Sequence, residues 1–238
     1  KRGWSRGMLE QCAGSMDSIA EHFYRGKESD NLLVHVGQLA DAVRKKAEGH
    51  RALQAELGLL PERRMPIAMT EWNYWRQPYV YGELGCIYDL SDALGVAAGL
   101  HEYFRQSDAI GMAFYAQTVN VIGCIKTTKT NAFMSTTALP LMLYRRQFGS
   151  IPLKVRGEGL PQALDVAAAW TKDLDALTVA VVNPLPQSQS FALIADGAEL
   201  HREGTVWTIA GKEPTLYNEV DKSRVAIEQK PFTLNGEV

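Results

Sequence analysis

Apolar residues recur every three or four positions in three stretches of the chain, and this spacing predicts amphipathic helices. In the first stretch, Leu32, Val36 and Leu39 share one face, while Lys45 and Lys46 lie on the opposite face. Acidic residues favour the start of a helix and basic residues its end, and the second and third stretches follow this rule. The predicted helices cover residues 31–57, 89–106 and 135–148.

Short apolar runs lie between these helices and predict β-strands. Pro66 can stand only at the beginning of such a strand, because proline has no N–H group to donate to a neighbouring strand. The order strand, helix, strand, helix, strand, helix is typical of βα units around a parallel sheet. Three strands cannot close a (β/α)₈ barrel, which takes about 250 residues. The predicted strands cover residues 16–24, 65–72 and 109–116.

The pattern changes near residue 150, where short β-prone runs separated by turn residues begin. Asn183-Pro184 and Asp196-Gly197 are typical turn sequences. Regularly punctuated short strands predict a β-sandwich. We therefore expect two domains, residues 1–150 and residues 151–238. The β-prone runs cover residues 166–170, 176–182, 190–194, 205–209 and 225–227.

Composition and charge narrow the classes of protein that remain. The chain has 46% hydrophobic and 22% charged residues, so a disordered protein is not expected. The net charge of −2 argues against a nucleic-acid-binding protein, which usually carries a basic stripe. The apolar stretch at residues 110–125 is too short and too polar to span a membrane. No signal peptide is visible after Lys1, which predicts a cytoplasmic protein.

Metal-binding and cysteine motifs are absent from the sequence. The three cysteines, Cys12, Cys86 and Cys124, are widely spaced and form no C-x-x-C pair, so neither a disulfide framework nor a zinc site is expected. The five histidines show no H-E-x-x-H spacing. We therefore expect no metal and no cofactor.

Glu71 is the main candidate for chemistry. It closes the second predicted strand and is followed by Trp72 and Asn73. In a barrel the carboxyl ends of the strands form the active-site face. A carboxylate beside an aromatic residue suits a nucleophile or an acid in sugar chemistry. The alternative is a glutamate in a structural ion pair.

Two further groups of polar residues end strands in the same way. His22 and Tyr24 share one face of the first strand, because side chains alternate along an extended chain. They could orient a carboxylate, although a packed aromatic pair is an equal alternative. Gln117 and Asn120 follow the third strand, and either amide could bind a sugar hydroxyl. Alternatively, the two amides form hydrogen bonds with backbone groups of the loop, and their position fits this role equally well.

The segment Thr70-Glu71-Trp72-Asn73 resembles the (D/E)-E-W-N stretch of glycoside hydrolase family 51, the α-L-arabinofuranosidases. Upstream, the sequence is similar to the family's D-x-(V/I)-S-x-H-x-Y strand, and downstream to its sandwich strands. The similarity covers nearly the whole chain, and its motifs are specific in combination. The further matching segments are residues 17–24, 90–94, 116–122, 177–183 and 217–218.

This resemblance implies the C-terminal part of a (β/α)₈ TIM barrel, about strands 6–8, followed by a β-sandwich. It implies a retaining enzyme that releases terminal α-L-arabinofuranosyl residues. Glu71 would be the nucleophile and Tyr24 the residue that orients it. By the same resemblance, the residues expected to bind substrate are His22, Trp72, Asn73 and Gln117. We expect the loop aromatics Trp75, Tyr79 and Tyr81 on the leaving-group side.

The sequence departs from the family at two points. Ala20 stands where the family usually has serine, and Glu21 follows it. The G-N-E motif that carries the family's acid/base glutamate is missing, as are barrel strands 1–5. We therefore expect the N-terminal remainder of the same enzyme as a partner that supplies this glutamate.

The expected partners and the alternative functions are as follows. An arabinofuranosyl saccharide is the expected substrate, and a homo-oligomer is one expectation because family members often form one. No nucleic acid and no membrane partner is expected. The alternatives are another retaining barrel glycosidase, such as a β-xylosidase or endoglucanase, and a non-catalytic carbohydrate-binding subunit.

Overall fold

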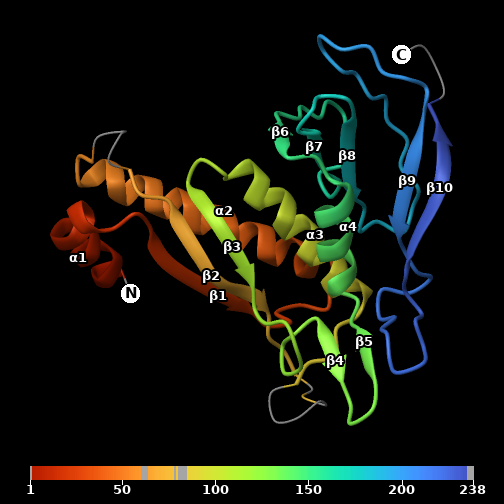
Figure 1. Cartoon of the computed structure of the whole chain (residues 1–238), viewed down its shortest axis with the longest axis horizontal. Coiled ribbons are helices and arrows are strands. Elements are labelled where there is room, and N and C mark those ends of the chain that lie inside the picture. The colour runs from red at the N-terminus through yellow and green to blue at the C-terminus, as the bar shows by residue number, and fades with distance from the viewer. Residues whose placement is uncertain (1, 60–63, 78, 80–84, 235–238) are drawn as a thin grey trace.

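A computed structural model describes residues 2–59, 64–77, 79 and 85–234 of the chain. Its first half alternates strands and helices, and its second half consists mainly of strands (Figure 1). The elements of the first half are α1 (Arg2–Cys12), a 3₁₀ turn (Ala13–Ser15), β1 (Ile19–Arg25), α2 (Leu32–Glu56), β2 (Ile67–Tyr74), α3 (Leu90–Arg105), β3 (Ile110–Tyr115), β4 (Ile125–Thr127), β5 (Ala132–Met134) and α4 (Ala138–Gln147).

The first half is built on a parallel sheet in the order β1-β2-β3. Helices α2 and α3 pack side by side against one face of this sheet (Figure 1). Asn31 caps α2, because its side-chain oxygen accepts hydrogen bonds from the backbone N–H groups of Leu33 and Val34. The predicted strands and helices of this half are confirmed, with ends shifted by a few residues.

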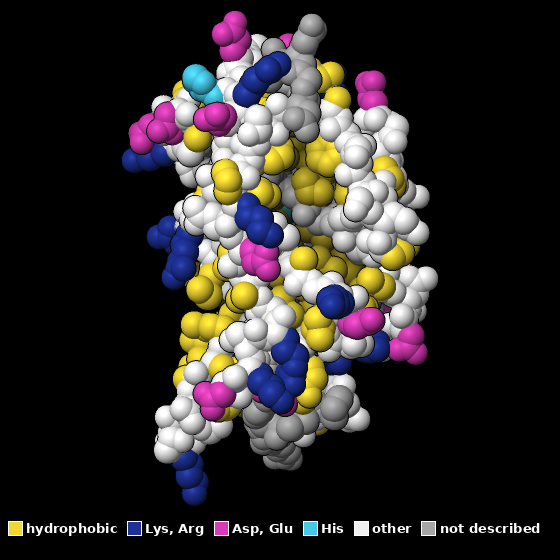
Figure 2. Space-filling view, turned by 90° about the vertical axis from the view of Figure 1, so that its right-hand side faces the viewer, with side chains coloured by type: hydrophobic (Ala, Val, Ile, Leu, Met, Phe, Trp, Pro, Cys, Tyr) yellow, Lys and Arg dark blue, Asp and Glu magenta, His cyan; other side chains and the backbone are white. Residues whose placement is uncertain are grey.

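The second half forms two antiparallel sheets, β6-β7-β8 and β9-β10. Strands β8 and β9 line a hollow of about 390 Å³ together with α3 and α4. Hydrophobic side chains gather in the hollowed face seen in Figure 2. The chain thus has the predicted architecture of barrel-type βα units followed by a β-sandwich. These strands are β6 (Ile151–Leu153), β7 (Asp165–Trp170), β8 (Leu177–Val182), β9 (Glu203–Ile209) and β10 (Ile227–Thr233).

Several predicted and observed elements differ. Residues 190–194 form no strand, and of the run predicted at 225–227 only Ile227 lies in a strand, as the first residue of β10. An extended run becomes a strand only where a neighbouring chain pairs with it, and the local pattern does not show that partner. The pattern missed β6, the β4-β5 hairpin and α1, in which Gly3 and Gly7 lower the helix propensity.

Polar contacts join the two halves of the chain. His101 of α3 lies between Asp165 of β7 (Nδ1–Oδ1 2.7 Å) and Tyr144 of α4 (Nε2–Oη 2.5 Å). Arg105 also donates to both oxygens of Asp165. This cluster spans the domain boundary expected near residue 150, and the boundary itself stays a prediction.

A second junction lies at the start of α3. The backbone N–H of Leu90 donates to the carbonyl of Leu216 at 2.8 Å, and that of Ser91 donates to Pro214 at 2.9 Å. The first N–H groups of a helix have no partner within the helix. Here a segment between β9 and β10 supplies that partner.

The first cluster predicts a pH-dependent contribution to stability. Burial alone would raise the pKa of Asp165, but hydrogen bonds from His101 and Arg105 outweigh burial and lower the pKa to about 2. The folded protein therefore binds this proton more weakly than the unfolded chain. The resulting stabilisation, about 2 kcal/mol, is complete above about pH 4 and is lost as the pH falls towards 2.

Asp165→Asn is expected to remove this stabilisation at pH 7 and to flatten the pH dependence between about pH 2 and 4. Urea unfolding of the longest soluble form of the protein, at a series of pH values, measures both effects. Asp173→Asn is the matched control, because Asp173 is exposed. A variant of Asp165 that keeps the wild-type slope below pH 4 would contradict the prediction.

Candidate active site

The carboxyl ends of β1 and β2 bring Glu71 and Tyr24 together. Glu71 is exposed, and it pairs in register with His22 of the neighbouring strand. The hydroxyl group of Tyr24 donates a hydrogen bond to Oε2 of Glu71. Burial and the adjacent carboxylate both raise the pKa of Tyr24, so the phenol keeps its proton and stays a donor. The structure thus provides a carboxylate that is open to solvent and held from one side.

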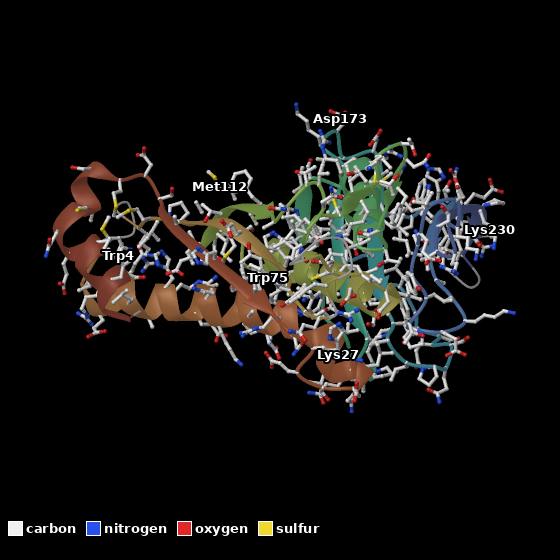
Figure 3. All side chains as sticks on the ribbon, turned by 90° about the horizontal axis from the view of Figure 1, so that it is seen from below. Trp4, Lys27, Trp75, Met112, Asp173 and Lys230 are labelled. Atoms are coloured by element: carbon white, nitrogen blue, oxygen red, sulfur yellow. The ribbon has the colours of Figure 1, made fainter. Side chains whose placement is uncertain are left out.

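Trp75 packs beside this pair. Its ring meets the ring of Tyr24 edge to face, with centroids 5.0 Å apart and an interplanar angle of 80°. Its backbone N–H donates to the carbonyl of Arg25 at 2.8 Å. In Figure 3, Trp75 lies in the middle of the molecule, far from Trp4 on α1. Of the other two loop aromatics, Tyr79 forms a bridge with Cys86, and Tyr81 lies outside the described residues.

Trp72 does not face the open site. Its side chain is 2% exposed and packs edge to face against Tyr103 of α3 and Tyr115 of β3. Glu71 and Trp72 are consecutive in a strand, so their side chains lie on opposite faces of the sheet. The substrate contact expected for Trp72 is therefore corrected: Trp72 packs behind the strand that carries Glu71.

Asn73 is also fully buried. Its Nδ2 donates to the carbonyls of Ala116 (2.6 Å) and Ile122 (2.7 Å) and to the hydroxyl of Tyr88 (2.9 Å). The amide therefore joins β2 to the loop that follows β3. The predicted substrate contact of Asn73 is corrected in the same way, because its polar atoms are used within the protein.

Gln117 lies in that loop, directly after Ala116. Its side chain is exposed and donates to the carbonyl of Val119 at 3.3 Å, a long and easily exchanged hydrogen bond. Because β2 and β3 are parallel neighbours, Gln117 and Glu71 both lie towards the end of the sheet where the strands have their C-termini. His22 is exposed beside Glu71. The roles of Gln117 and His22 in substrate binding stay predictions.

The side chain of Asn120 is hydrogen-bonded within its own part of the protein, which was the alternative to binding a sugar hydroxyl. Its side chain donates to the hydroxyl of Thr127 at 2.8 Å and accepts from the backbone N–H of Thr127 at 2.9 Å. These two bonds hold the loop that carries Gln117 against β4. The amide of Asn120 is thus occupied by the loop itself.

The sheet exposes apolar side chains as well as the polar side chains described above. Met112 and Phe114 of β3 are 49% and 53% exposed. Figure 3 shows Met112 on the side of the sheet away from α2. Within the described residues, β1 and β3 each pair with β2 alone in this sheet. Two sheet edges and one apolar face are therefore open next to Glu71.

The described residues contain neither a candidate metal site nor a membrane-spanning helix. No group of three or more His, Cys, Asp or Glu side chains there is arranged to hold a metal ion. Among the helices of the described ranges, none is both long and apolar enough to cross a lipid bilayer.

Comparisons with known proteins place this arrangement in a family. Residues 70–238 match the model of the alpha-L-arabinofuranosidase C-terminal domain. A probable alpha-L-arabinofuranosidase C from Aspergillus flavus is 34% identical over 200 residues, which are 76% of this chain and 39% of that protein. Alpha-L-arabinofuranosidase C from Emericella nidulans is 32% identical over 77% of this chain and 39% of its own length.

Solved structures show the same fold. The arabinose complex of alpha-L-arabinofuranosidase from Thermotoga maritima superposes with a TM-score of 0.82 and 24% identity, over 98% of this chain and 52% of that one. The family 51 arabinofuranosidase from Xanthomonas axonopodis pv. citri gives a TM-score of 0.75 and 17% identity, over 98% of this chain and 53% of its own.

The chain thus spans about 39% of the length of the curated relatives it matches and about half of the matched structures. It belongs to the family of the alpha-L-arabinofuranosidase C-terminal domain, and its fold is that of the C-terminal part of a glycoside hydrolase family 51 arabinofuranosidase.

Proposed function

We propose that this chain is the C-terminal part of a retaining glycoside hydrolase that releases terminal α-L-arabinofuranosyl residues, with Glu71 as its nucleophile. The observation that carries the proposal is the exposed carboxylate of Glu71, held by the hydroxyl of Tyr24 at the carboxyl ends of two parallel strands. The curated relatives are named arabinofuranosidases, and the matched Thermotoga maritima structure is an arabinose complex.

Retaining hydrolysis uses two carboxyl groups about 5–5.5 Å apart. In this proposal, one oxygen of Glu71 attacks the anomeric carbon and forms a covalent glycosyl-enzyme. A second carboxylic acid protonates the oxygen of the leaving group as its bond to the anomeric carbon breaks. The resulting carboxylate then takes a proton from water as the water oxygen attacks the anomeric carbon. The bond between that carbon and Glu71 breaks, which releases arabinose and restores the carboxylate of Glu71. Because Tyr24 donates to Oε2, the free Oε1 of Glu71 is the attacking atom.

The second carboxylic acid comes from outside this chain. The sequence contains no G-N-E motif, and the sheet offers two open edges in its described part. The half-exposed Met112 and Phe114 are the kind of apolar side chains that fill the interior of a closed barrel. We infer that an N-terminal remainder of the enzyme covers this face, completes the barrel and brings the acid/base glutamate to Glu71.

Gln117 and His22 are the remaining candidates for binding sugar hydroxyls. Both are exposed near the carboxyl ends of strands that flank Glu71. An amide can donate to one hydroxyl and accept from another, which suits recognition of a furanose ring. A cytoplasmic location and a homo-oligomer remain part of the proposal.

The proposal is tested by comparing the complete enzyme with residues 1–238 alone. The complete enzyme should cleave 4-nitrophenyl α-L-arabinofuranoside faster than the corresponding β-xyloside or β-glucoside. Residues 1–238 alone should be insoluble or inactive, because open strand edges and exposed apolar side chains favour aggregation. Release of 4-nitrophenol and size-exclusion chromatography measure these outcomes.

Three results would contradict the proposal in different ways. A soluble monomer of residues 1–238 with arabinofuranosidase activity would remove the need for an N-terminal part. A complete enzyme that prefers the β-xyloside or β-glucoside would change the substrate class. A complete protein that binds arabino-oligosaccharide without turnover would be a carbohydrate-binding subunit.

A further inference from the structure

Arg76 lies directly after Trp75 in the loop that leaves β2, and its side chain enters a charged cluster at the start of α3. The guanidinium group is only 12% exposed. Its Nη2 donates to Oδ2 of Asp89 at 2.9 Å and to Oδ2 of Asp92 at 2.6 Å, and its Nε donates to Oδ1 of Asp92 at 3.2 Å. Arg76 thus holds both carboxylates of the α3 capping box.

Asp92 is the centre of this cluster. Its side chain is fully buried and lies 2.9 Å from Nε2 of His35 on α2. Burial would raise the pKa of Asp92, but the contacts with His35 and Arg76 outweigh burial and lower it. Asp92 is therefore ionised, and the cluster joins α2, α3 and the loop after β2 through charge-assisted hydrogen bonds.

The same cluster also contacts Tyr74, the residue that precedes Trp75. The ring of His35 stacks on the ring of Tyr74 at 4.5 Å, and the hydroxyl of Tyr74 donates to the carbonyl of His35 at 2.7 Å. Residues 74 and 76 are therefore both anchored to the helices. Trp75 between them has its ring against Tyr24, and Tyr24 donates to Glu71.

We propose that Arg76 is a positioning residue of the active site: by anchoring the loop to α2 and α3, it holds Trp75 against Tyr24 and thereby fixes the hydroxyl of Tyr24 on Glu71. The kinetic part of this inference rests on the proposed function, whereas the geometric part does not. The guanidinium group of Arg76 binds Asp89 and Asp92 rather than Glu71 or Tyr24. A purely structural role would stabilise the fold without changing the alignment of Glu71.

The first test replaces Arg76 in the complete enzyme. Arg76→Gln is expected to lower kcat about 10–100-fold with KM changed less than about threefold, because misplaced catalytic groups slow the chemical step. Arg76→Lys keeps the charge but not the two-pronged geometry, so its kcat should lie between wild type and Arg76→Gln.

The control is Arg105→Gln, which removes an arginine from the other end of α3. Arg105 also bridges two carboxylates, those of Glu102 and Asp165, far along the helix from Asp92. Both substitutions remove an ion pair of α3, yet Arg105→Gln should leave kcat within about twofold of wild type. Equal losses of kcat in the two glutamine variants would overturn the proposal.

A double-mutant cycle tests the route through Tyr24. If Arg76 acts through the hydroxyl of Tyr24, adding Arg76→Gln to Tyr24→Phe should lower kcat less than about threefold further. Independent effects that multiply in full would overturn this route. Trp75→Phe leaves the ion cluster intact, and an unchanged kcat in that variant would also overturn it.

A final measurement does not depend on activity. The edge-to-face contact of Trp75 and Tyr24 should contribute to near-ultraviolet circular dichroism, identified as the signal lost in Trp75→Phe. That signal should also disappear in Arg76→Gln, return in part in Arg76→Lys and persist in Arg105→Gln. Retention of the signal in folded Arg76→Gln would overturn the proposal. If wild type cleaves no arabinofuranoside, the proposed function fails, and this spectrum still decides the role of Arg76.

Discussion

Glu71→Ala in the complete enzyme is expected to lose at least about 10⁴-fold in kcat on an activated arabinofuranoside. The substitution removes the oxygen that attacks the anomeric carbon, while Tyr24 and the β2 backbone stay in place. Added azide should restore part of the rate by attacking from the vacated position. The product would then be a β-L-arabinofuranosyl azide, which nuclear magnetic resonance distinguishes from arabinose.

Glu21→Gln is the matched control for this experiment. Glu21 is a carboxylate on the neighbouring strand β1, but its side chain pairs with Lys46 of α2 and Ser5 of α1. It should keep kcat within a few-fold of wild type. Substantial residual turnover in Glu71→Ala without azide would remove Glu71 from the nucleophile role.

Asn73→Ala is expected to damage both stability and catalysis. The change leaves the buried carbonyl of Ala116 without its amide donor, whereas the carbonyl of Ile122 keeps a hydrogen bond from the hydroxyl of Tyr88. The free energy of unfolding should fall by about 2 kcal/mol, since an unsatisfied buried group costs about 1–3 kcal/mol. The loop that carries Gln117 loses its tie to β2, so kcat/KM should fall about 100-fold. Urea unfolding and steady-state kinetics measure the two effects.

Asn131→Ala provides the comparison for Asn73. Asn131 is an exposed asparagine in the turn between β4 and β5. Its replacement should change the free energy of unfolding by less than about 0.5 kcal/mol and leave kcat/KM unchanged. If Asn73→Ala kept wild-type kcat/KM, the loop after β3 would not depend on Asn73 for its position.

The sequence located the centre of the candidate site better than its surroundings. Glu71 and Tyr24 both lie in the C-terminal halves of strands with a clear apolar pattern, and the structure places them in contact. The side-chain faces of Trp72 and Asn73 were harder to predict, because β2 buries three residues, exposes two and buries three again. That pattern arises from irregular pairing with both neighbours and from the loop that covers Asn73.

Contacts between distant segments account for most of what the sequence did not show. Asp89 and Asp92 fit the acidic start of the helix predicted at residues 89–106, but Arg76 and His35, which bind Asp92, lie outside that local pattern. The run at residues 190–194 has the composition of a strand, but it pairs with none of the described strands, and its local pattern does not reveal that lack of a partner. Short patterns report local preference, whereas pairing depends on the whole fold.

The hydrogen bonds from Leu90 and Ser91 to residues 214–216 have a practical consequence for engineering. The C-terminal half cannot be exchanged on its own, because its carbonyls accept the N–H group of Leu90 and share that of Ser91 with the side chain of Asp89. A chimera that joins this barrel portion to a foreign sandwich leaves the N–H group of Leu90 without its acceptor, unless the new sandwich provides a carbonyl at the same place. A unit intended for transfer therefore has to keep residues 214–216 together with α3.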